Sequence, residues 1–338
     1  MMSVSLPAAA TLALAMLGSA CQSSAEPAAA PEGPAAAAEP VAAPPASVGD
    51  AAVAPAAPPA SNAGADAALT PADTTQRLDG ETAALFDRIV ETAEAERWAA
   101  LPYGELVQRV GEALRGQPYV AGMLDEPAAE TLVVSLRAFD CVLYVENVLA
   151  IARAIALGTP TYAAYADGVR QQRYRGGEMG AYCSRLHYFS DWIRDNDARG
   201  WVDDVTAQIG GVRFDKTIDF MSQNRGSYPR LDSDETYACI VETEADLAGV
   251  ELFYIPQERI AEAYPMLQPG DIIATATSIG GLDVTHTGFV HQTPEHTGFM
   301  HASLSSEQVK ISDDLAAYVQ GIRSQIGIVV ARPVDPRG

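Results

Sequence analysis

The residue best placed for chemistry in this 338-residue sequence is Cys141, which directly follows Asp140. Asp140 is a preferred N-cap residue, and the apolar run after it predicts a buried helix from residue 141 to about 156. The first turn of a helix carries partial positive charge and unpaired N–H groups, which favour a thiolate and help to hold an oxyanion. A lone helical cysteine is more commonly small core filling, so position alone does not assign a role to Cys141.

Four of the five histidines recur at intervals of five residues, namely His286, His291, His296 and His301. Residues 292–295 are typical of a turn between two strands. A hairpin that closes symmetrically about Thr293 and Pro294 would place the first histidine opposite the last, and the middle two opposite each other. Because side chains alternate along a strand, the odd spacing predicts that the two pairs lie on opposite faces. We expect one pair to point into the protein and the pair beside the turn to face solvent.

A thiol with two adjacent imidazoles is the composition of a cysteine hydrolase, in which one histidine is the base and the second orients it. The competing interpretation is a zinc ion held by Cys141, His286, His301 and a water. That interpretation leaves the thiol at the helix start without a purpose, and no cysteine lies in a C-x-x-C pair. We therefore expect neither a metal nor any other cofactor.

The elements that must position these residues change character along the chain. Apolar spacing of three and four predicts helices, and short alternating or apolar runs between turn residues predict strands. The expected helices span residues 81–98, 105–114, 141–156, 162–174 and 184–196. The expected strands span residues 130–136, 269–277, 283–292, 296–303, 308–312 and 326–333. Helices followed by a strand meander or small barrel predict an α+β domain with an antiparallel sheet.

Several separated motifs resemble, in the same order, those of NlpC-type cell-wall cysteine peptidases. More narrowly, they are similar to the branch described as N-acetylmuramoyl-L-alanine amidases. The motifs are Gly116-Gln-Pro-Tyr119, Phe139-Asp-Cys-Val-Leu-Tyr-Val-Glu146, Asp283-Val-Thr-His-Thr-Gly-Phe-Val290 and Met300-His-Ala-Ser303, with a further segment at residues 184–192. The resemblance runs from about residue 80 to about residue 335.

This resemblance implies a papain-like core in which N-terminal helices precede a nucleophile helix packed on an antiparallel sheet or small barrel. It implies that Cys141 is the nucleophile, that His286 is the general base, that His301 orients this base and that Tyr119 lies close to the oxyanion. The gap between the two histidines is slightly longer than is usual in the branch. A longer turn accounts for this without changing which residues face each other. Leu143 stands where the branch usually has Thr, and we expect it to affect packing.

The candidates for substrate binding are Arg185, His187, Asp283 and Ser303. Arg185 and His187 lie in the segment distinctive of the branch and are candidates to bind a carboxylate or a sugar. The alternative is that Arg185 pairs with one of the many acids and that His187 is structural. Asp283 and Ser303 are candidates to line the cleft. We expect Glu146 to be a structural carboxylate.

The first 20 residues carry no charge and are followed by Cys21. Their apolar stretch is too short to span a bilayer and is typical of a secretory signal. We expect residues 1–21 to be a lipoprotein signal with a lipidated Cys21; the alternative is a cleaved signal followed by an ordinary cysteine. Residues 22–76 are rich in Ala and Pro, which predicts a disordered tether. Residues 77–338 would then form a catalytic domain on the periplasmic side of a bacterial cell envelope.

The formal net charge of −22 argues against a nucleic-acid partner, because phosphate binding needs clustered Lys and Arg. No polybasic patch for lipid headgroups occurs either, so we expect membrane contact only through the anchor. Cys183 and Cys239 are left as a disulfide pair or as two buried, unlinked thiols. We expect a monomer that acts on peptidoglycan or on released muropeptides.

The reaction expected from the resemblance is hydrolysis of the amide between the lactyl group of N-acetylmuramic acid and L-alanine. A γ-D-glutamyl endopeptidase with the same Cys-His-His triad is the alternative within this class. A non-catalytic lipoprotein that binds peptidoglycan and a thiol-based transacylase are the alternatives from other classes.

Overall fold

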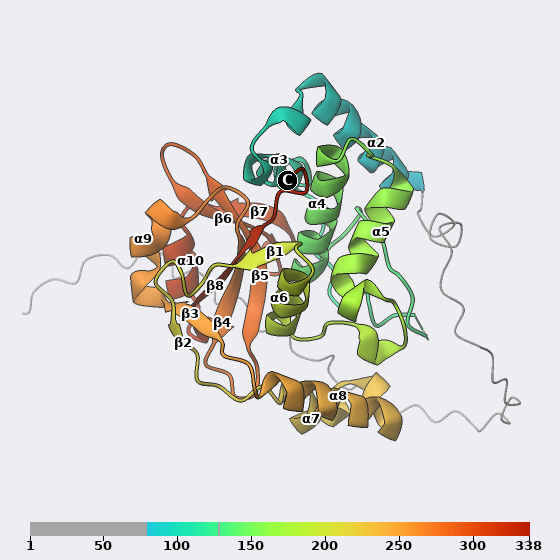
Figure 1. Ribbon diagram of the computed structural model, residues 1–338, viewed down its shortest axis with the longest axis vertical. Helices are drawn as coiled ribbons and strands as arrows, with labels where there is room; N and C mark the ends of the chain where they lie inside the picture. The colour runs from blue at the N-terminus through green and yellow to red at the C-terminus, as the bar shows by residue number, and fades with distance from the viewer. Residues whose placement is uncertain (1–79, 128) are drawn as a thin grey trace, which may run out of the picture. The chain divides into compact units, whose positions relative to one another are not determined.

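A computed structural model describes residues 80–127 and 129–338 (Figure 1). The predicted signal at residues 1–21 and the predicted tether at residues 22–76 lie outside the described residues. Of the domain predicted over residues 77–338, the structure describes the part that begins at Gly80. Among the described residues, no helix combines the length and the apolar character that a bilayer crossing requires.

An eight-stranded sheet, in which neighbouring strands pair antiparallel, organises the molecule. Its order is β2-β3-β8-β4-β5-β6-β7, and β1 pairs with β8 off this path. The strands are β1 (Val202–Asp204), β2 (Val212–Arg213), β3 (Phe253–Pro256), β4 (Ile272–Thr277), β5 (Val284–Gln292), β6 (Thr297–Ser303), β7 (Gln308–Ser312) and β8 (Gln325–Pro333). The predicted meander over β4–β7 and the α+β class are confirmed, whereas β1–β3 were not predicted.

The α-helices mostly precede the meander. They are α2 (Gly80–Ala95), α3 (Tyr103–Ala113), α4 (Cys141–Ala156), α5 (Tyr162–Arg173), α6 (Phe189–Ala198), α7 (Phe220–Gln223), α8 (Asp234–Leu247), α9 (Ile260–Ala263) and α10 (Leu315–Gln320). Short 3₁₀ turns are η1 (Trp98–Ala100), η2 (Arg175–Gly177), η3 (Tyr182–Ser184), η4 (Arg225–Ser227), η5 (Pro229–Asp232), η6 (Gln257–Arg259) and η7 (Tyr264–Met266). The helix predicted from residue 184 begins only at Phe189, because the backbone of Arg185 pairs with that of Tyr174.

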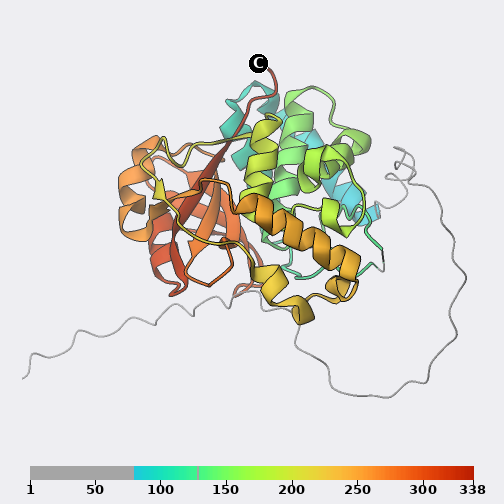
Figure 2. The same cartoon turned by 60° about the horizontal axis from the view of Figure 1, so that its bottom comes forward.

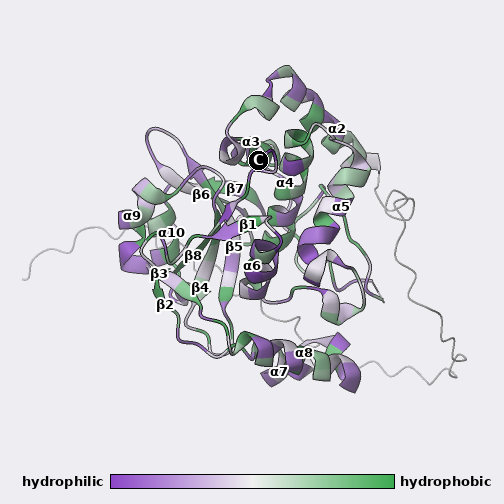
Figure 3. Ribbon diagram, in the orientation of Figure 1, coloured by the Kyte–Doolittle hydropathy of each residue, from purple (hydrophilic) through white to green (hydrophobic). Residues whose placement is uncertain are grey.

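Helices cover both faces of the sheet (Figures 1 and 2). Alternation along β5 produces this arrangement: Phe289 packs against Tyr144 of α4, while Val290 joins a cluster with Leu315 and Val319 of α10. The larger core gathers α2–α6 on the first face, and the smaller core gathers α9 and α10 on the second. Figure 3 shows apolar residues concentrated along α4 and the central strands, with hydrophilic residues on α8 and α9. Helix α4 is therefore buried on nearly all sides, as its sequence predicts.

The strand predicted over residues 130–136 is wrong. This segment lies beside α5 without joining the sheet, because side chains supply its backbone partners. The Thr131 carbonyl accepts a hydrogen bond from the Tyr174 hydroxyl, and the Val133 carbonyl accepts one from the Arg173 guanidinium. An apolar run satisfied in this way needs no strand partner.

A third, smaller core lies around α7 and α8 and contains buried Tyr188, Ile240 and Leu247. The Cys183–Cys239 disulfide joins η3 to α8 at this cluster, which resolves the two alternatives left by the sequence.

Candidate active site

Helix α4 begins at Cys141, as predicted, and Asp140 is its N-cap. The Asp140 carboxylate accepts a hydrogen bond of 2.8 Å from the Leu143 N–H. Cys141 is half-buried and is the free cysteine of the described residues. A local signal, the aspartate before an apolar run, is thus sufficient to place the thiol at the helix start.

The environment of the Cys141 thiol favours its neutral form, contrary to our expectation from the helix start. Burial raises the pKa of the thiol to about 12, and the Asp140 carboxylate acts in the same direction. Hydrogen bonds from the backbone N–H groups of Thr287, Val142 and Cys141 itself lower the pKa, but they do not outweigh burial. The thiol therefore needs a base to take its proton as it reacts.

The β5–β6 hairpin has a different register from the one predicted. Its pairs run from Gln292 with Thr297 to Phe289 with Met300. The Thr293 N–H donates to the His296 carbonyl, so the hairpin is centred between Pro294 and Glu295. The prediction that the histidines face each other directly is wrong by two residues, because the turn lies one position further along than assumed.

His286 and His301 nevertheless meet. The distance from His286 Nε2 to His301 Nδ1 is 2.7 Å, and the rings stand at 87° with their centroids 4.9 Å apart. A shift of two residues keeps every side chain on its face, so the pair becomes diagonal and remains in contact. Gly288 packs closely against β6, and an added Cβ there would come within 2.8 Å of the His301 Cβ. Both histidines are buried, as predicted for one of the two pairs.

The second histidine pair lies on the opposite face, as the odd spacing predicts. His291 contacts Glu112 of α3, with 2.9 Å between Nε2 and Oε1, and its ring stacks on His296 at 5.8 Å. His296 is exposed, as expected, but His291 is buried, so the prediction that it faces solvent is wrong. The carboxylate on α3 explains the difference, because it gives a buried imidazole a partner.

The sheet opens between β5 and β6 at the place where Cys141 reaches it. The paired residues end at Phe289 and Met300, although β6 continues beside β7 as far as Ser303. Val290 uses its N–H and carbonyl toward β4, so the alternate residue Thr287 directs its N–H toward β6. This N–H bonds the Cys141 thiol. The thiol therefore lies beside the residue that follows His286.

A β-bulge precedes the candidate base. Thr275 of β4 pairs with His286, and the next residue, Ala276, pairs with Val284, so Thr285 has no direct partner on β4. Bulges re-aim side chains and are frequent beside active sites. Here the bulge turns Val284 to the α4 face, where it packs on the larger core, while His286 lies with Phe299 on the other face.

Aromatic and polar groups hold the second histidine. His301 is fully buried, stacks on Phe299 at 4.6 Å and contacts the Tyr318 ring of α10 at 4.8 Å. Its Nε2 lies 3.2 Å from the Ser312 Oγ. Burial lowers the pKa of His301 well below its usual value, and the neighbouring His286 and Lys310 act in the same direction. His301 is therefore neutral.

Tyr119 lies in a segment that connects the start of α4 to the far edge of the sheet. Its N–H donates to the Glu307 carbonyl just before β7, and the N–H of Val120 donates to the carbonyl of Phe139, two residues before Cys141. The structure thus places the Tyr119 backbone beside the residues that lead into α4.

The proposed substrate-binding residues have different surroundings. Arg185 is buried and pairs with Asp125 at 2.8 Å and with Glu130 at 3.5 Å, which favours its structural alternative. The ring nitrogen Nε2 of His187 lies 2.9 Å from the Tyr182 carbonyl. Burial, and then the charge of Arg185, lower the pKa of His187 to about 3. Both side chains are thus engaged within the fold.

Asp283 lies just before β5, Ser303 is the last residue of β6, and both are buried. The Asp283 carboxylate accepts hydrogen bonds from the N–H groups of Ser190 and Val284, each 2.8 Å long. The Ser303 hydroxyl accepts a hydrogen bond from the Ser306 N–H.

The zinc interpretation does not fit the two imidazoles. Two nitrogens bound tetrahedrally to one zinc at ~2.0–2.1 Å lie roughly 3.3 Å apart. The 2.7 Å between His286 Nε2 and His301 Nδ1 is instead a hydrogen-bond distance. Within residues 80–127 and 129–338, no cluster of His, Cys, Asp and Glu side chains has the arrangement of a metal site.

Four parts of the site were not predicted from the sequence: the Thr287 N–H, Gly288, Ser312 and Tyr318. Gly288 carried a signal, because a glycine inside an apolar strand indicates a close approach of neighbouring groups. Ser312 and Tyr318 carried none, since their contacts with His301 depend on the sheet register and on where α10 packs.

A family model described as N-acetylmuramoyl-L-alanine amidase-like, or AmiA-like, matches residues 109–328. The chain belongs to this AmiA-like family. The match includes Cys141, His286 and His301, and its name indicates a hydrolase that acts on peptidoglycan.

Solved structures agree with the AmiA-like assignment. An N-acetylmuramoyl-L-alanine amidase from Bacteroides uniformis is 32% identical with a TM-score of 0.66, over 69% of this chain and 99% of its own. A Bacteroides fragilis protein named as a xylanase is also 32% identical, with a TM-score of 0.63, over 66% of this chain and 99% of its own. A Legionella pneumophila protein at 19% identity and a TM-score of 0.56 shares the fold, over 77% of this chain and 97% of its own. A comparison with curated proteins gives no match.

Proposed function

We propose that this protein is a cysteine amidase that hydrolyses the bond between the lactyl group of N-acetylmuramic acid and L-alanine. The observation that carries the proposal is the contact of His286 with His301 beside Thr287, whose N–H bonds the Cys141 thiol. The AmiA-like family and the Bacteroides uniformis amidase support the choice of bond.

One arrangement of protons satisfies the two histidines. Neutral His301 donates its Nε2–H to the Ser312 hydroxyl and accepts at Nδ1 from the His286 Nε2–H. This leaves the Nδ1 lone pair of His286 as the base. Since the pKa of His301 lies well below its usual value, His301 remains an acceptor when His286 becomes positively charged. His301 is therefore the residue that orients His286.

The reaction then proceeds in two halves. His286 Nδ1 takes the thiol proton while the Cys141 sulfur attacks the amide carbonyl, and backbone N–H groups at the start of α4 with the Tyr119 region stabilise the oxyanion. The carbon–nitrogen bond breaks as His286 gives its proton to the amine of L-alanine. Water, deprotonated by His286, attacks the thioester, and the departing Cys141 sulfur recovers the proton.

The arrangement of α4 on an antiparallel sheet supports a papain-like, NlpC-type core as part of this proposal. The lipoprotein signal, the tether and the periplasmic location are proposed from the sequence of residues 1–76. They would place the hydrolase where peptidoglycan is found.

The decisive experiment is mass analysis of defined muropeptides after incubation with the full chain and with its Cys141→Ala variant. We expect a free disaccharide and an intact stem peptide, and a rate at least about 10³-fold lower for the variant, because no other group forms the acyl intermediate. The Cys141→Ala change removes one sulfur atom from a half-buried site, so a matching melting temperature controls for folding.

Two outcomes would redirect the proposal. Cleavage within the stem that depends on Cys141 would make the protein an endopeptidase with the same residues. Binding of muropeptides without cleavage would make it a peptidoglycan-binding protein.

A further inference from the structure

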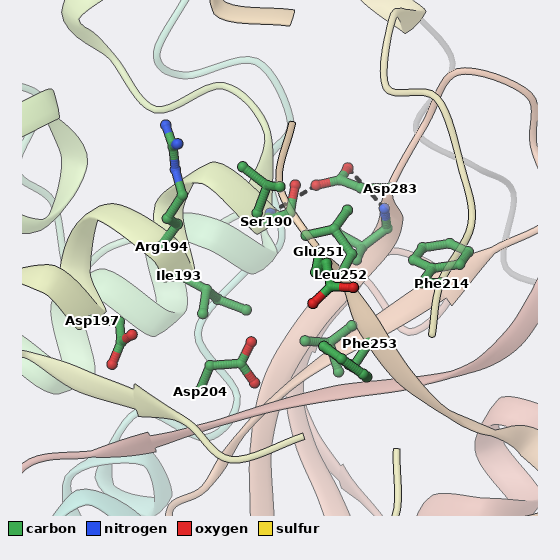
Figure 4. Close-up of a pocket in the computed structure, with 13 residues that line it drawn as sticks. Ser190, Ile193, Arg194, Asp197, Asp204, Phe214, Glu251, Leu252, Phe253 and Asp283 are labelled. Atoms are coloured by element: carbon green, nitrogen blue, oxygen red, sulfur yellow. Dashed lines mark hydrogen bonds between the residues drawn. The ribbon is translucent and has the colours of Figure 1, made fainter. Parts of the chain in front are cut away.

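A cavity of about 190 Å³ lies on the α4 face of the sheet, next to the strand that carries His286 (Figure 4). Residues of α6, β1, the β2–β3 region, β8 and the start of β5 line it, among them Ile193, Asp197, Asp204, Phe214, Leu252 and Asp283. Asp283 lies three residues before His286, which is roughly 10 Å along a strand at ~3.3 Å per residue. The cavity therefore adjoins the start of the strand on which His286 lies.

The walls of this cavity are apolar and its rim is acidic. Ile193, Phe214 and Leu252 provide an aliphatic and aromatic lining, while the carboxylates of Asp197 and Asp204 lie at the exposed side. The volume corresponds to about six water molecules at ~30 Å³ each, which suits one slender side chain.

The basic residues near the cavity do not form ion pairs with all of the carboxylates at its rim. Arg194 pairs with Asp191 at 3.1 Å, and in Figure 4 its side chain points away from the cavity. Glu251 is already paired with Arg213 at 2.6 Å. Within residues 80–127 and 129–338, Asp197 and Asp204 form no ion pair, and the Asp204 carboxylate accepts a hydrogen bond of 2.9 Å from the Thr206 N–H.

The two remaining carboxylates lie close together. The Asp204 N–H donates to the Asp197 carboxylate, and burial, followed by the charges of Asp203 and Asp204, raises the pKa of Asp197. A cation placed between like charges relieves their repulsion. At the inner end, the Ser190 N–H donates a hydrogen bond of 2.8 Å to the Asp283 carboxylate. The cavity thus offers an apolar interior and two carboxylates at its exposed side.

We propose that this cavity binds the aliphatic side chain of the diamino acid in a peptidoglycan stem peptide, with its terminal ammonium between Asp197 and Asp204. The inference rests on the proposed function, since it names a part of the same substrate. The methylene groups lie on Ile193, Phe214 and Leu252, and the ammonium makes charge-assisted hydrogen bonds at the rim. The cavity then positions the stem peptide while its first amide lies at the thiol.

Binding to the full-length Cys141→Ala protein tests this assignment without turnover. Calorimetry compares a stem peptide that has a free side-chain amine with the same peptide acetylated at that amine. We expect acetylation to weaken binding about tenfold, or ~1.4 kcal/mol. Asp197→Asn and Asp204→Asn should each weaken binding of the free amine severalfold and leave the acetylated peptide unchanged. Glu242→Gln, an equal charge change at an exposed site on α8, should alter neither.

Equal binding of the two peptides, or no binding of either, would overturn the assignment. A loss of equal size for both peptides in the aspartate variants would also overturn it, because it would indicate a structural role. Failure of the proposed function is a different result: the wild-type chain would then cleave neither the free nor the acetylated muropeptide. Cleavage of both with equal kcat/KM would keep the function and refute the amine site.

Discussion

The two ends of the β5–β6 hairpin carry the same pair of residue types in very different surroundings. At the turn, His291 and His296 stack on each other and His291 pairs with Glu112. At the far end, His286 and His301 are joined by a 2.7 Å contact among the rings of Phe299 and Tyr318. The strands are paired at the turn and separate before His286.

The difference shows that the surroundings of an imidazole pair depend on strand pairing as well as on residue type. A second group can approach the pair only where the backbone is not paired with a neighbouring strand. Where the ladder is complete, the backbone groups are occupied by the neighbouring strand. Where it stops, the N–H of Thr287 bonds the Cys141 thiol instead. The following changes test the contrast, beginning with the largest effect.

Replacing His301 should affect catalysis far more than replacing His296. His301→Leu removes the acceptor for His286 Nε2–H, so we expect kcat to fall about 100-fold, in the range of general-base catalysis. His301→Asn retains an amide acceptor, as in Cys-His-Asn enzymes, and should recover most of this loss. The measurement is kcat against pH, together with the melting temperature.

The matched control is His296→Leu, which should leave kcat within about twofold because this side chain is exposed. If His301→Asn were as inactive as His301→Leu while both folded normally, His301 would not act as a hydrogen-bond acceptor.

Adding a methyl group at Gly288 should force the strand that carries His301 away from β5. The new Cβ would lie 2.5 Å from the Met300 carbonyl oxygen and 2.8 Å from the His301 Cβ. We expect Gly288→Ala to lower the free energy of unfolding by about 1–3 kcal/mol and to reduce activity. Denaturant unfolding measures the first effect. Gly280→Ala, where a Cβ meets nothing within 4 Å, should be close to neutral; equal losses would refute the steric argument.

The smallest expected effect concerns the turn end. The hydrogen bond from His291, and then that from Gln108, lower the pKa of Glu112 below 4.5 against the effect of burial. A lowered carboxyl pKa contributes stability above pH 4.5 that is lost as the pH falls through the folded-state value. Glu112→Gln should therefore cost up to about 1 kcal/mol at neutral pH, and less at pH 3.

Thermal or urea unfolding at several pH values measures this difference. The control is Glu105→Gln on the same helix, at an exposed position. A stability difference for Glu112→Gln that did not change with pH would show that the His291 contact has no electrostatic component.

Local signals predicted the parts of the site that depend on neighbouring residues. Asp140 before an apolar run placed the thiol at a helix start, and the period of strands placed the two histidine pairs on opposite faces. The prediction that the two histidine pairs lie on opposite faces held despite the wrong register, because a shift of two residues leaves each side chain on its face. The register itself was not predictable, because it depends on which four residues close the turn.

Other parts of the structure depend on groups distant in the sequence. The segment over residues 130–136 has the composition of a strand, yet Arg173 and Tyr174 satisfy its backbone. Tyr318 reaches His301 from a helix that follows the meander, and the raised pKa of Cys141 results from burial by the whole fold. No local pattern contains that information.

The disulfide between Cys183 and Cys239 has a thermodynamic consequence of its own. It joins residues 56 positions apart and thereby closes a loop that includes β1, β2, α6, α7 and part of α8. In the chain-entropy account, closing a loop of this length in the unfolded ensemble is worth about 4 kcal/mol. The bond also ties α8 to η3, the segment before α6. Its reduction would remove this restraint from the unfolded chain, while the Cys141 thiol takes no part in it.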